Sequence, residues 1–127
     1  MPGERVNGLS LDVIEGEILG IGGLAGQGKL GISNGIMGLY EAEGEVTLFG
    51  EKLNIMDTRE VLKAGVAMVS EDRKGVGLLL DRSIEDNIVF NSMQVKNEYL
   101  KKIGPFTLVD SKKVRQTAEE YIKSLDI

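Results

Sequence analysis

The segment that most constrains the fold is a glycine-rich loop between an apolar run and a helical pattern. Ile18–Ile21 is short and continuously apolar, which is typical of a strand buried on both faces. Gly22–Gly28 follows at once, and apolar side chains then recur at helical spacing as far as Tyr40. Glycines allow successive backbone N–H groups to point inward around an anion. Strand, glycine loop and helix in this order therefore predict a phosphate-binding loop.

The loop matches the pattern G-x-x-x-x-G-K-[ST] at every position except the last. Lys29 is expected to reach the outer phosphates as a point charge, and the helix beginning there directs its positive end at the same place. Leu30 departs from the pattern, because a Ser or Thr hydroxyl in this position coordinates Mg²⁺. We therefore expect nucleotide binding without a metal ligand, and we assign no catalytic residue. The candidate phosphate-binding residues are Gly23, Leu24, Ala25, Gly26, Gln27, Gly28, Lys29, Leu30 and Gly31.

The remaining pattern predicts an α/β fold in one partial domain, residues 1–127. Further strands are expected at Val6–Ile14 and Val66–Val69, and a hairpin at Val46–Ile55. We expect a partial P-loop core built on Ile18–Ile21 and Val66–Val69, next to a small antiparallel part from Val6–Ile14 and the hairpin. Ser70–Arg82 is predicted to be a loop. Helices are expected after Gly28, Asp57, Ser83 and Ser111; Asp57 with Glu60 and Ser83 with Asp86 have the spacing of helix caps, and Gly65 is placed to end the second helix.

Composition excludes several classes of protein. The chain has 127 residues, enough for one domain, with no cysteine and no histidine. Disulfides, thiolate metal sites and histidine-based catalysis are thereby excluded. A net charge of −5 provides no basic field for nucleic acid. No run approaches the ~20 apolar residues of a membrane span, and no apolar signal core follows the N-terminus, so a cytosolic location is the default expectation.

Three segments carry a resemblance to a known family. Glu15–Gly20 precedes the loop, Gly44–Gly50 follows it, and Gly65–Lys74 leads through Gly77-Leu78 to Ser83–Ile88. Over nearly its whole length the chain resembles ATP-binding-cassette ATPases, and more narrowly the second cassette of the tandem-cassette ATPases that power bacterial monosaccharide importers. The resemblance implies ATP as the nucleotide, with Mg²⁺ expected for the family. It also implies membrane permease subunits and the other cassette as partners, and a peripheral position on the cytoplasmic face of the membrane.

The same resemblance assigns Glu71 to the Q-loop, which in that family links the nucleotide site to the membrane subunits. That position is usually glutamine in active cassettes, whereas second cassettes of the sugar type often carry glutamate there and a degenerate phosphate loop. The signature motif, the Walker B carboxylates and a switch histidine are not found in the chain. Nor is there an aromatic residue in Met1–Arg5, where the family often stacks adenine. We therefore expect a front piece of a cassette that binds nucleotide, does not hydrolyse it alone, and self-associates through its uncovered core.

Other interpretations remain open. The chain is also compatible with a nucleoside-type importer ATPase or with a small stand-alone P-loop enzyme. Such an enzyme needs a metal-holding hydroxyl at position 30, and a GTPase also needs an Asn-Lys-x-Asp motif, which is absent. The glycines could instead serve only turns in an interaction domain, and composition alone favours a solvated charged loop for Glu71–Lys74.

Overall fold

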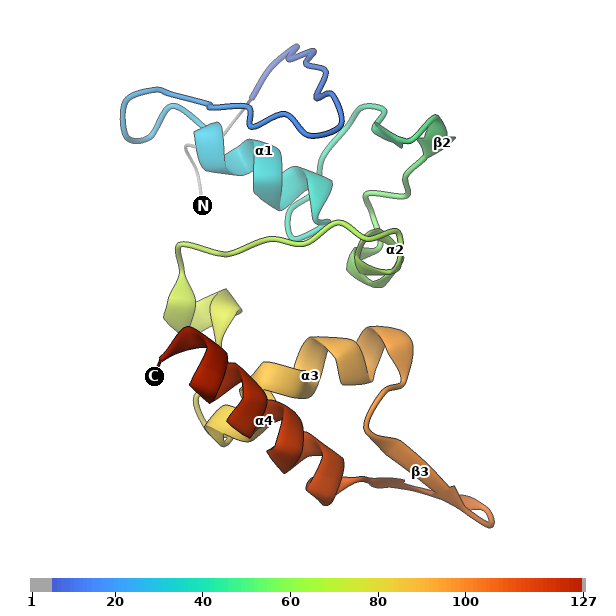
Figure 1. Cartoon of the computed structure of the whole chain (residues 1–127). Helices are drawn as coiled ribbons and strands as arrows, with labels where there is room; N and C mark the ends of the chain where they lie inside the picture. Colours follow the sequence, from blue (N-terminus) through green and yellow to red (C-terminus); the bar gives the residue numbers. More distant parts are fainter. Residues whose placement is uncertain (1–5, 127) are drawn as a thin grey trace. The chain divides into compact units, whose positions relative to one another are not determined.

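The computed structural model describes residues 6–126, which belong to two compact units, Met1–Met68 and Val69–Ile127 (Figure 1). The sheets within the described residues are both two-stranded and antiparallel. No helix in this part of the chain is both long enough and apolar enough to cross a membrane. The structure therefore has the mixed α/β character that the sequence predicts, and one of its two small antiparallel sheets lies within the predicted hairpin at Val46–Ile55.

The first unit contains the helices α1 (Lys29–Ile36) and α2 (Thr58–Lys63) and the strands β1 (Thr47–Leu48) and β2 (Glu51–Lys52). Thr47 pairs with Lys52 and Leu48 with Glu51. Phe49 and Gly50 form the turn, with φ of 51° and 84°. Positive φ at both turn residues gives the backbone twist that suits a two-residue hairpin. The predicted hairpin is confirmed, although its paired strands are shorter than Val46–Ile55.

A small apolar core holds this unit together. Met37, Leu53, Ile55 and Val61 are buried, and Val61 is fully inaccessible to solvent. Gly38 has φ of 68°, and a Cβ on it would lie 2.6 Å from the carbonyl oxygen of Ile55. Only glycine therefore fits here, and its positive φ cannot continue α1, which ends before the predicted limit at Tyr40.

The start and the end of α2 follow the sequence prediction. The carboxylate of Asp57 accepts hydrogen bonds from the backbone N–H groups of Arg59 and Glu60, at 2.9 and 3.2 Å. After Lys63 the chain turns through Ala64 to Gly65, whose φ of 99° cannot continue a helix. Both helix signals are confirmed.

The second unit contains a single π-helical turn (Arg73–Gly77), the helices α3 (Ile84–Lys96) and α4 (Ser111–Leu125), and the strands β3 (Leu100–Ile103) and β4 (Phe106–Val109). Val89 of α3 and Val114 and Ala118 of α4 are buried where the two helices pack together. Arg115 and Glu85 form an ion pair of 3.4 Å between these helices. The predicted helices after Ser83 and Ser111 are confirmed, and the Ser83 hydroxyl accepts the Asp86 N–H at 3.1 Å.

The β3–β4 hairpin is a feature that the sequence interpretation missed. Leu100 pairs with Val109 and Ile103 with Phe106, across a two-residue connection at Gly104-Pro105. The Asp110 N–H also donates to the carbonyl of Tyr99 at 2.7 Å, which closes the base of the hairpin. The sequence does contain an indication of this hairpin, because Leu100–Ile103 and Phe106–Val109 both include apolar residues and flank the turn residues Gly104-Pro105.

Three predicted strands, Val6–Ile14, Ile18–Ile21 and Val66–Val69, are wrong for this structure, because none of them is a strand here. A strand exists through its hydrogen-bonded neighbours, and the described residues supply no paired ladder for these runs. Their side chains are correspondingly uncovered, with Ile18 97% and Val69 100% exposed. The core sheet expected around these segments is therefore not formed by the described residues.

Candidate phosphate-binding site

The predicted loop enters α1 through two glycines in the left-handed region. Gly26 has φ of 79° and Gly28 has φ of 82°. A side chain at either position would strain the backbone. Gly28 is buried and precedes the first residue of α1, and its carbonyl accepts the first hydrogen bond of the helix, from the Gly31 N–H at 2.8 Å. The glycines thus set the abrupt change of direction from loop to helix.

Side chains of the loop bond to the loop's own backbone. The Leu24 N–H donates to Oε1 of Gln27 at 3.2 Å, and the Gln27 N–H donates to the Leu24 carbonyl at 3.4 Å. The exposed ammonium of Lys29 donates to the Gly23 carbonyl at 3.1 Å. These bonds close the loop and hold the lysine charge next to its backbone.

The first turn of α1 has the electrostatics of an anion site. Gly28 offers no side-chain acceptor to the first N–H groups of the helix, and the first turn contains no acidic residue. Unsatisfied N–H groups and the helix dipole favour a negative group at this end, and Lys29 adds a full positive charge. The residues present therefore fit a phosphate.

The last position of the loop pattern carries a side chain without an oxygen atom. Leu30 is half-buried, and its side chain has no oxygen. The nearest hydroxyl along α1, that of Ser33, donates to the Leu30 carbonyl at 3.1 Å. Within residues 6–126 no cluster of three or more acidic, histidine or cysteine side chains is placed to hold a metal.

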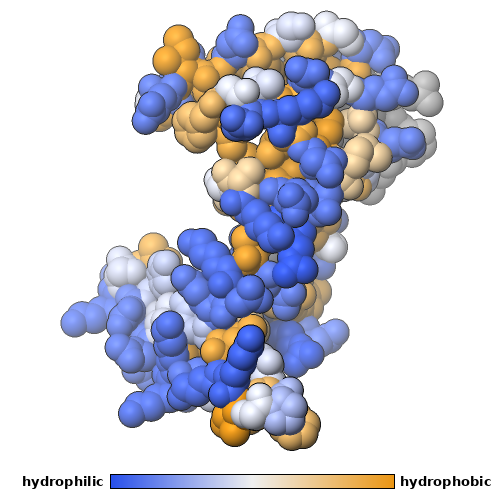
Figure 2. Space-filling model, turned by 90° about the vertical axis from the view of Figure 1, so that its right-hand side faces the viewer, coloured by the Kyte–Doolittle hydropathy of each residue, from blue (hydrophilic) through white to orange (hydrophobic). Residues whose placement is uncertain are grey.

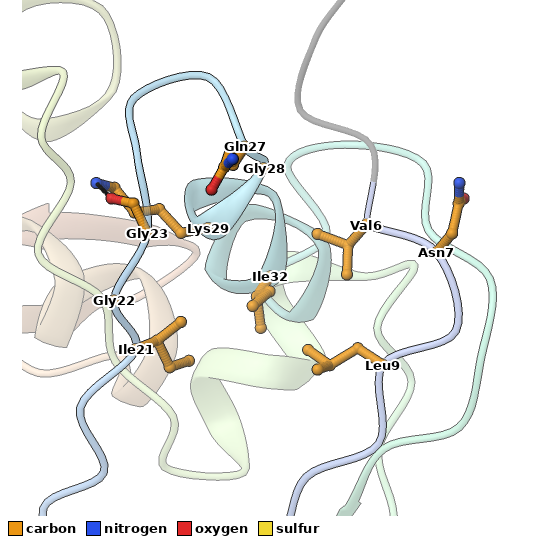
Figure 3. Close-up of a pocket in the computed structure, with 10 residues that line it drawn as sticks. All are labelled: Val6, Asn7, Leu9, Ile21, Gly22, Gly23, Gln27, Gly28, Lys29 and Ile32. Carbon is orange, nitrogen blue, oxygen red and sulfur yellow. Dashed lines mark hydrogen bonds between the residues drawn. The ribbon is translucent and has the colours of Figure 1, made fainter.

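A cavity of about 280 Å³ adjoins the loop. Figure 3 shows the apolar side chains of Leu9, Ile21 and Ile32 directed toward the space beside the loop. This volume is close to the lower end of the range for small-molecule sites. The lining residues are Val6, Asn7, Leu9, Ile21, Gly22, Gly23, Gln27, Gly28, Lys29 and Ile32.

Several of these lining residues were not candidates from the sequence. Val6 and Leu9 alternate with polar residues, and that pattern was interpreted as a strand. The loop closure by Gln27 was also not foreseen, because its position in the motif accepts any residue. The candidates that the structure does bring together are Gly23–Gly31.

Glu71 lies in the second unit, where it is exposed. The segment around it is shaped by local hydrogen bonds: the Asp72 carboxylate accepts the Gly75 N–H at 2.8 Å, and the Asp72 N–H donates to Ser70 Oγ at 3.2 Å. A Cβ on Gly75 would collide with the Asp72 carboxylate. Part of the predicted loop Ser70–Arg82 is therefore a defined π-helical turn. The expectation about adenine stacking at Met1–Arg5 lies outside the described residues.

Comparison with known proteins extends these observations. Residues 6–127 match the family model described as ABC transporter. The chain is 44% identical over 88 residues to the ribose import ATP-binding protein RbsA of Oceanobacillus iheyensis, covering 68% of this chain and 18% of the relative. It is 37% identical over 126 residues to RbsA 2 of Rhizobium meliloti, covering 98% and 23%. It is 32% identical over 130 residues to the xylose import ATP-binding protein XylG of Thermoanaerobacter pseudethanolicus, covering 100% and 24%.

The chain thus spans less than a quarter of the length of these curated relatives. No solved structure matches it.

Proposed function

Since this chain belongs to the ABC transporter family, we propose that it is an ATP-binding portion of a sugar importer, with the nucleotide phosphates held by Gly23–Gly31. The observation that carries the proposal is the loop itself. Left-handed glycines lead into the uncapped N-terminus of α1, with the Lys29 ammonium beside it. That arrangement supplies backbone donors and one cation to a polyphosphate.

Each part of the loop has a distinct role in this proposal. The N–H groups at the start of α1 donate to phosphate oxygens, and Lys29 exchanges its bond to the Gly23 carbonyl for the outer phosphates. Gln27 holds the loop closed through Leu24. The cavity next to the loop, which is lined by both polar and apolar residues, offers a place for the less polar part of the nucleotide.

We assign no hydrolysis to this chain alone. Mg²⁺ in family members neutralises charge that develops on the transferred phosphate, and here Leu30 offers that ion no ligand. Nucleotide binding by this chain is accordingly expected to be weak and insensitive to Mg²⁺.

The relatives suggest the partners. Their names specify ribose or xylose import, and on that basis the chain acts with membrane permease subunits and the other cassette at the cytoplasmic face of the membrane. Glu71, in the Q-loop position, belongs to the segment that communicates with the permease. The family match runs through both units, which supports their being parts of one nucleotide-binding domain.

Self-association is also part of the proposal. Tyr121 and Leu125 lie on α4 at helical spacing from the buried Val114, yet they are 52% and 66% exposed. Ile18 and Val69 are more exposed still. Exposed apolar surface of this kind favours burial against another molecule, at about 25 cal/mol per Å² before the cost of association.

The test of nucleotide binding is a titration of the purified chain with ATP. Lys29→Ala is expected to weaken binding by at least about tenfold, because a charge-assisted bond to phosphate is lost. Lys52→Ala is the matched control, since it removes an exposed lysine of the same unit that bonds Glu45 instead. Equal affinities for the wild type and both variants would refute the assignment of Lys29.

A further inference from the structure

The β3–β4 hairpin presents an uncovered apolar face. Residues alternate between the two faces of a strand, so the pairing places Ile103, Phe106 and Leu108 on one face, together with Lys101. Ile103 is 60%, Phe106 69% and Leu108 53% exposed. In Figure 1 the hairpin extends away from the ends of α3 and α4, and neither helix covers it. The apolar face therefore has no partner within the described residues.

Positive charge is concentrated around the hairpin, with Lys101 on the apolar face, Lys102 on the opposite face and Lys112 and Lys113 at the start of α4. Residues 100–113 contain four lysines and one aspartate, a net charge of +3 in a chain whose net charge is −5. Lys101 bonds Asp110 at 2.8 Å, and Lys113 lies 5.3 Å from the ring centre of Tyr99. Lys102 and Lys112 are exposed and make no ion pair with any described residue. In Figure 2 the lowest part of the molecule, where the hairpin ends, has hydrophobic atoms next to hydrophilic ones.

The other hairpin among the described residues, β1–β2, provides an internal comparison. Its turn also exposes an aromatic side chain, Phe49, at 86%. Residues 41–52 around it contain four glutamates and one lysine, a net charge of −3. Two exposed aromatic hairpins of opposite charge thus occur in one chain, and only the β3–β4 hairpin suits an anionic partner.

We propose that the β3–β4 hairpin binds the surface of an anionic lipid bilayer, with Ile103 and Phe106 entering the headgroup region and the lysines contacting the lipid phosphates. Long lysine side chains can extend their ammonium groups to phosphates while their stems lie along apolar surface. Juxtamembrane lysines are attracted to anionic lipids, and apolar side chains anchor the contact. The contact would hold the chain at the membrane independently of nucleotide.

The charge composition favours lipid over protein as the occupant. Cores of protein–protein interfaces are depleted in lysine and enriched in arginine, whereas this segment has four lysines and no arginine. Two copies of the chain meeting through this face would bring two segments of net +3 together, and like charges repel. Lysine on a sheet edge also prevents strand pairing, but that role explains neither Lys112 outside the hairpin nor the exposed Phe106.

The experiment is co-sedimentation of the full 127-residue chain with vesicles. Vesicles of phosphatidylcholine alone are compared with vesicles that contain one quarter phosphatidylglycerol, at low and high salt. Binding is expected only with the anionic vesicles and is expected to fall as salt rises. Phe106→Ala should weaken partitioning by about tenfold, since most of a buried phenyl ring is lost. Lys102→Gln should weaken it by about fivefold.

Phe49→Ala is the matched control and should leave partitioning unchanged. All these positions are exposed, so far-UV circular dichroism should stay the same, and ATP titration should be unaffected by the hairpin variants. The proposal is overturned if the wild type does not bind anionic vesicles, if neutral vesicles bind equally well, or if Phe49→Ala weakens binding as much as Phe106→Ala. It is also overturned if Phe106→Ala abolishes the dimers seen by light scattering but leaves vesicle binding unchanged. The apolar face of the hairpin would then be covered by a second copy of the chain and not by lipid.

Discussion

Replacing Leu30 with serine would supply the hydroxyl oxygen that the loop lacks. Leu30 is half-buried on α1. Full burial of a leucine side chain is worth about 1.5–3 kcal/mol, so losing a half-buried one should lower stability by roughly 1 kcal/mol. One oxygen ligand to Mg²⁺ is comparable to a charge-assisted hydrogen bond, of about 1.5 kcal/mol or more. We therefore expect Leu30→Ser to bind ATP about tenfold more tightly with Mg²⁺ than with a chelator.

The assay is isothermal titration with ATP, in Mg²⁺ and in a chelator, on the wild type, Leu30→Ser and Leu30→Ala. Leu30→Ala removes the leucine side chain without adding an oxygen, so it isolates the stability cost from the metal effect. Wild type and Leu30→Ala should show the same affinity under both conditions. If the wild type already gains strongly from Mg²⁺, or if Leu30→Ser responds no more than Leu30→Ala, the account of position 30 is wrong.

Three further predictions concern the loop, the second unit and assembly. Gln27→Ala removes the side-chain bond to Leu24 and should weaken ATP binding by about two- to fivefold, which titration against the wild type measures. The Lys101 ammonium lowers the pKa of Asp110, aided by N–H donors of α4. Because the pKa of Asp110 is lower in the folded state, its carboxylate stabilises the fold above about pH 4, and this stability is lost as pH falls through the lowered pKa. Asp110→Asn should therefore make the helix signal in circular dichroism depend less on pH below about pH 4. Light scattering over a concentration series should show dimers, and a strictly monomeric species that binds no hydrophobic dye would contradict the proposed self-association.

Local signals of the sequence were sufficient for most helices. Asp57 and Ser83 cap the helices that they were predicted to cap. Each side-chain oxygen accepts a backbone N–H only two or three residues further along the chain, so the cap depends on local sequence alone. The turn at Phe49-Gly50 is likewise decided by its own backbone. Such features depend on neighbours along the chain, which the sequence displays directly.

Features that depend on distant neighbours were harder to predict. Ile18–Ile21 and Val66–Val69 have the composition of buried strands, but a strand also needs a paired ladder, which composition does not supply. The β3–β4 hairpin was missed for the opposite reason, since two lysines interrupt its apolar pattern.

The candidate site likewise has some features that were predictable from local sequence and others that depend on distant residues. The glycine spacing of the loop and the helix after it were predictable, because both follow from local conformational limits. The cavity was not, since it brings Val6 and Leu9 next to Ile32 from a separate part of the chain. The bond between Gln27 and Leu24 depends on a side-chain orientation that spacing alone does not determine.

Backbone amide NMR can test whether Gly23–Gly31 holds the phosphates of a nucleotide. The isotopically labelled chain is titrated with ATP and, separately, with adenosine. We expect ATP to shift the amide resonances of Gly26, Gly28 and Lys29 most strongly and adenosine to shift them much less. Lys29→Ala should reduce the response to ATP. An ATP titration that leaves these amides unmoved, or that moves them no more than adenosine does, would contradict the proposed phosphate binding.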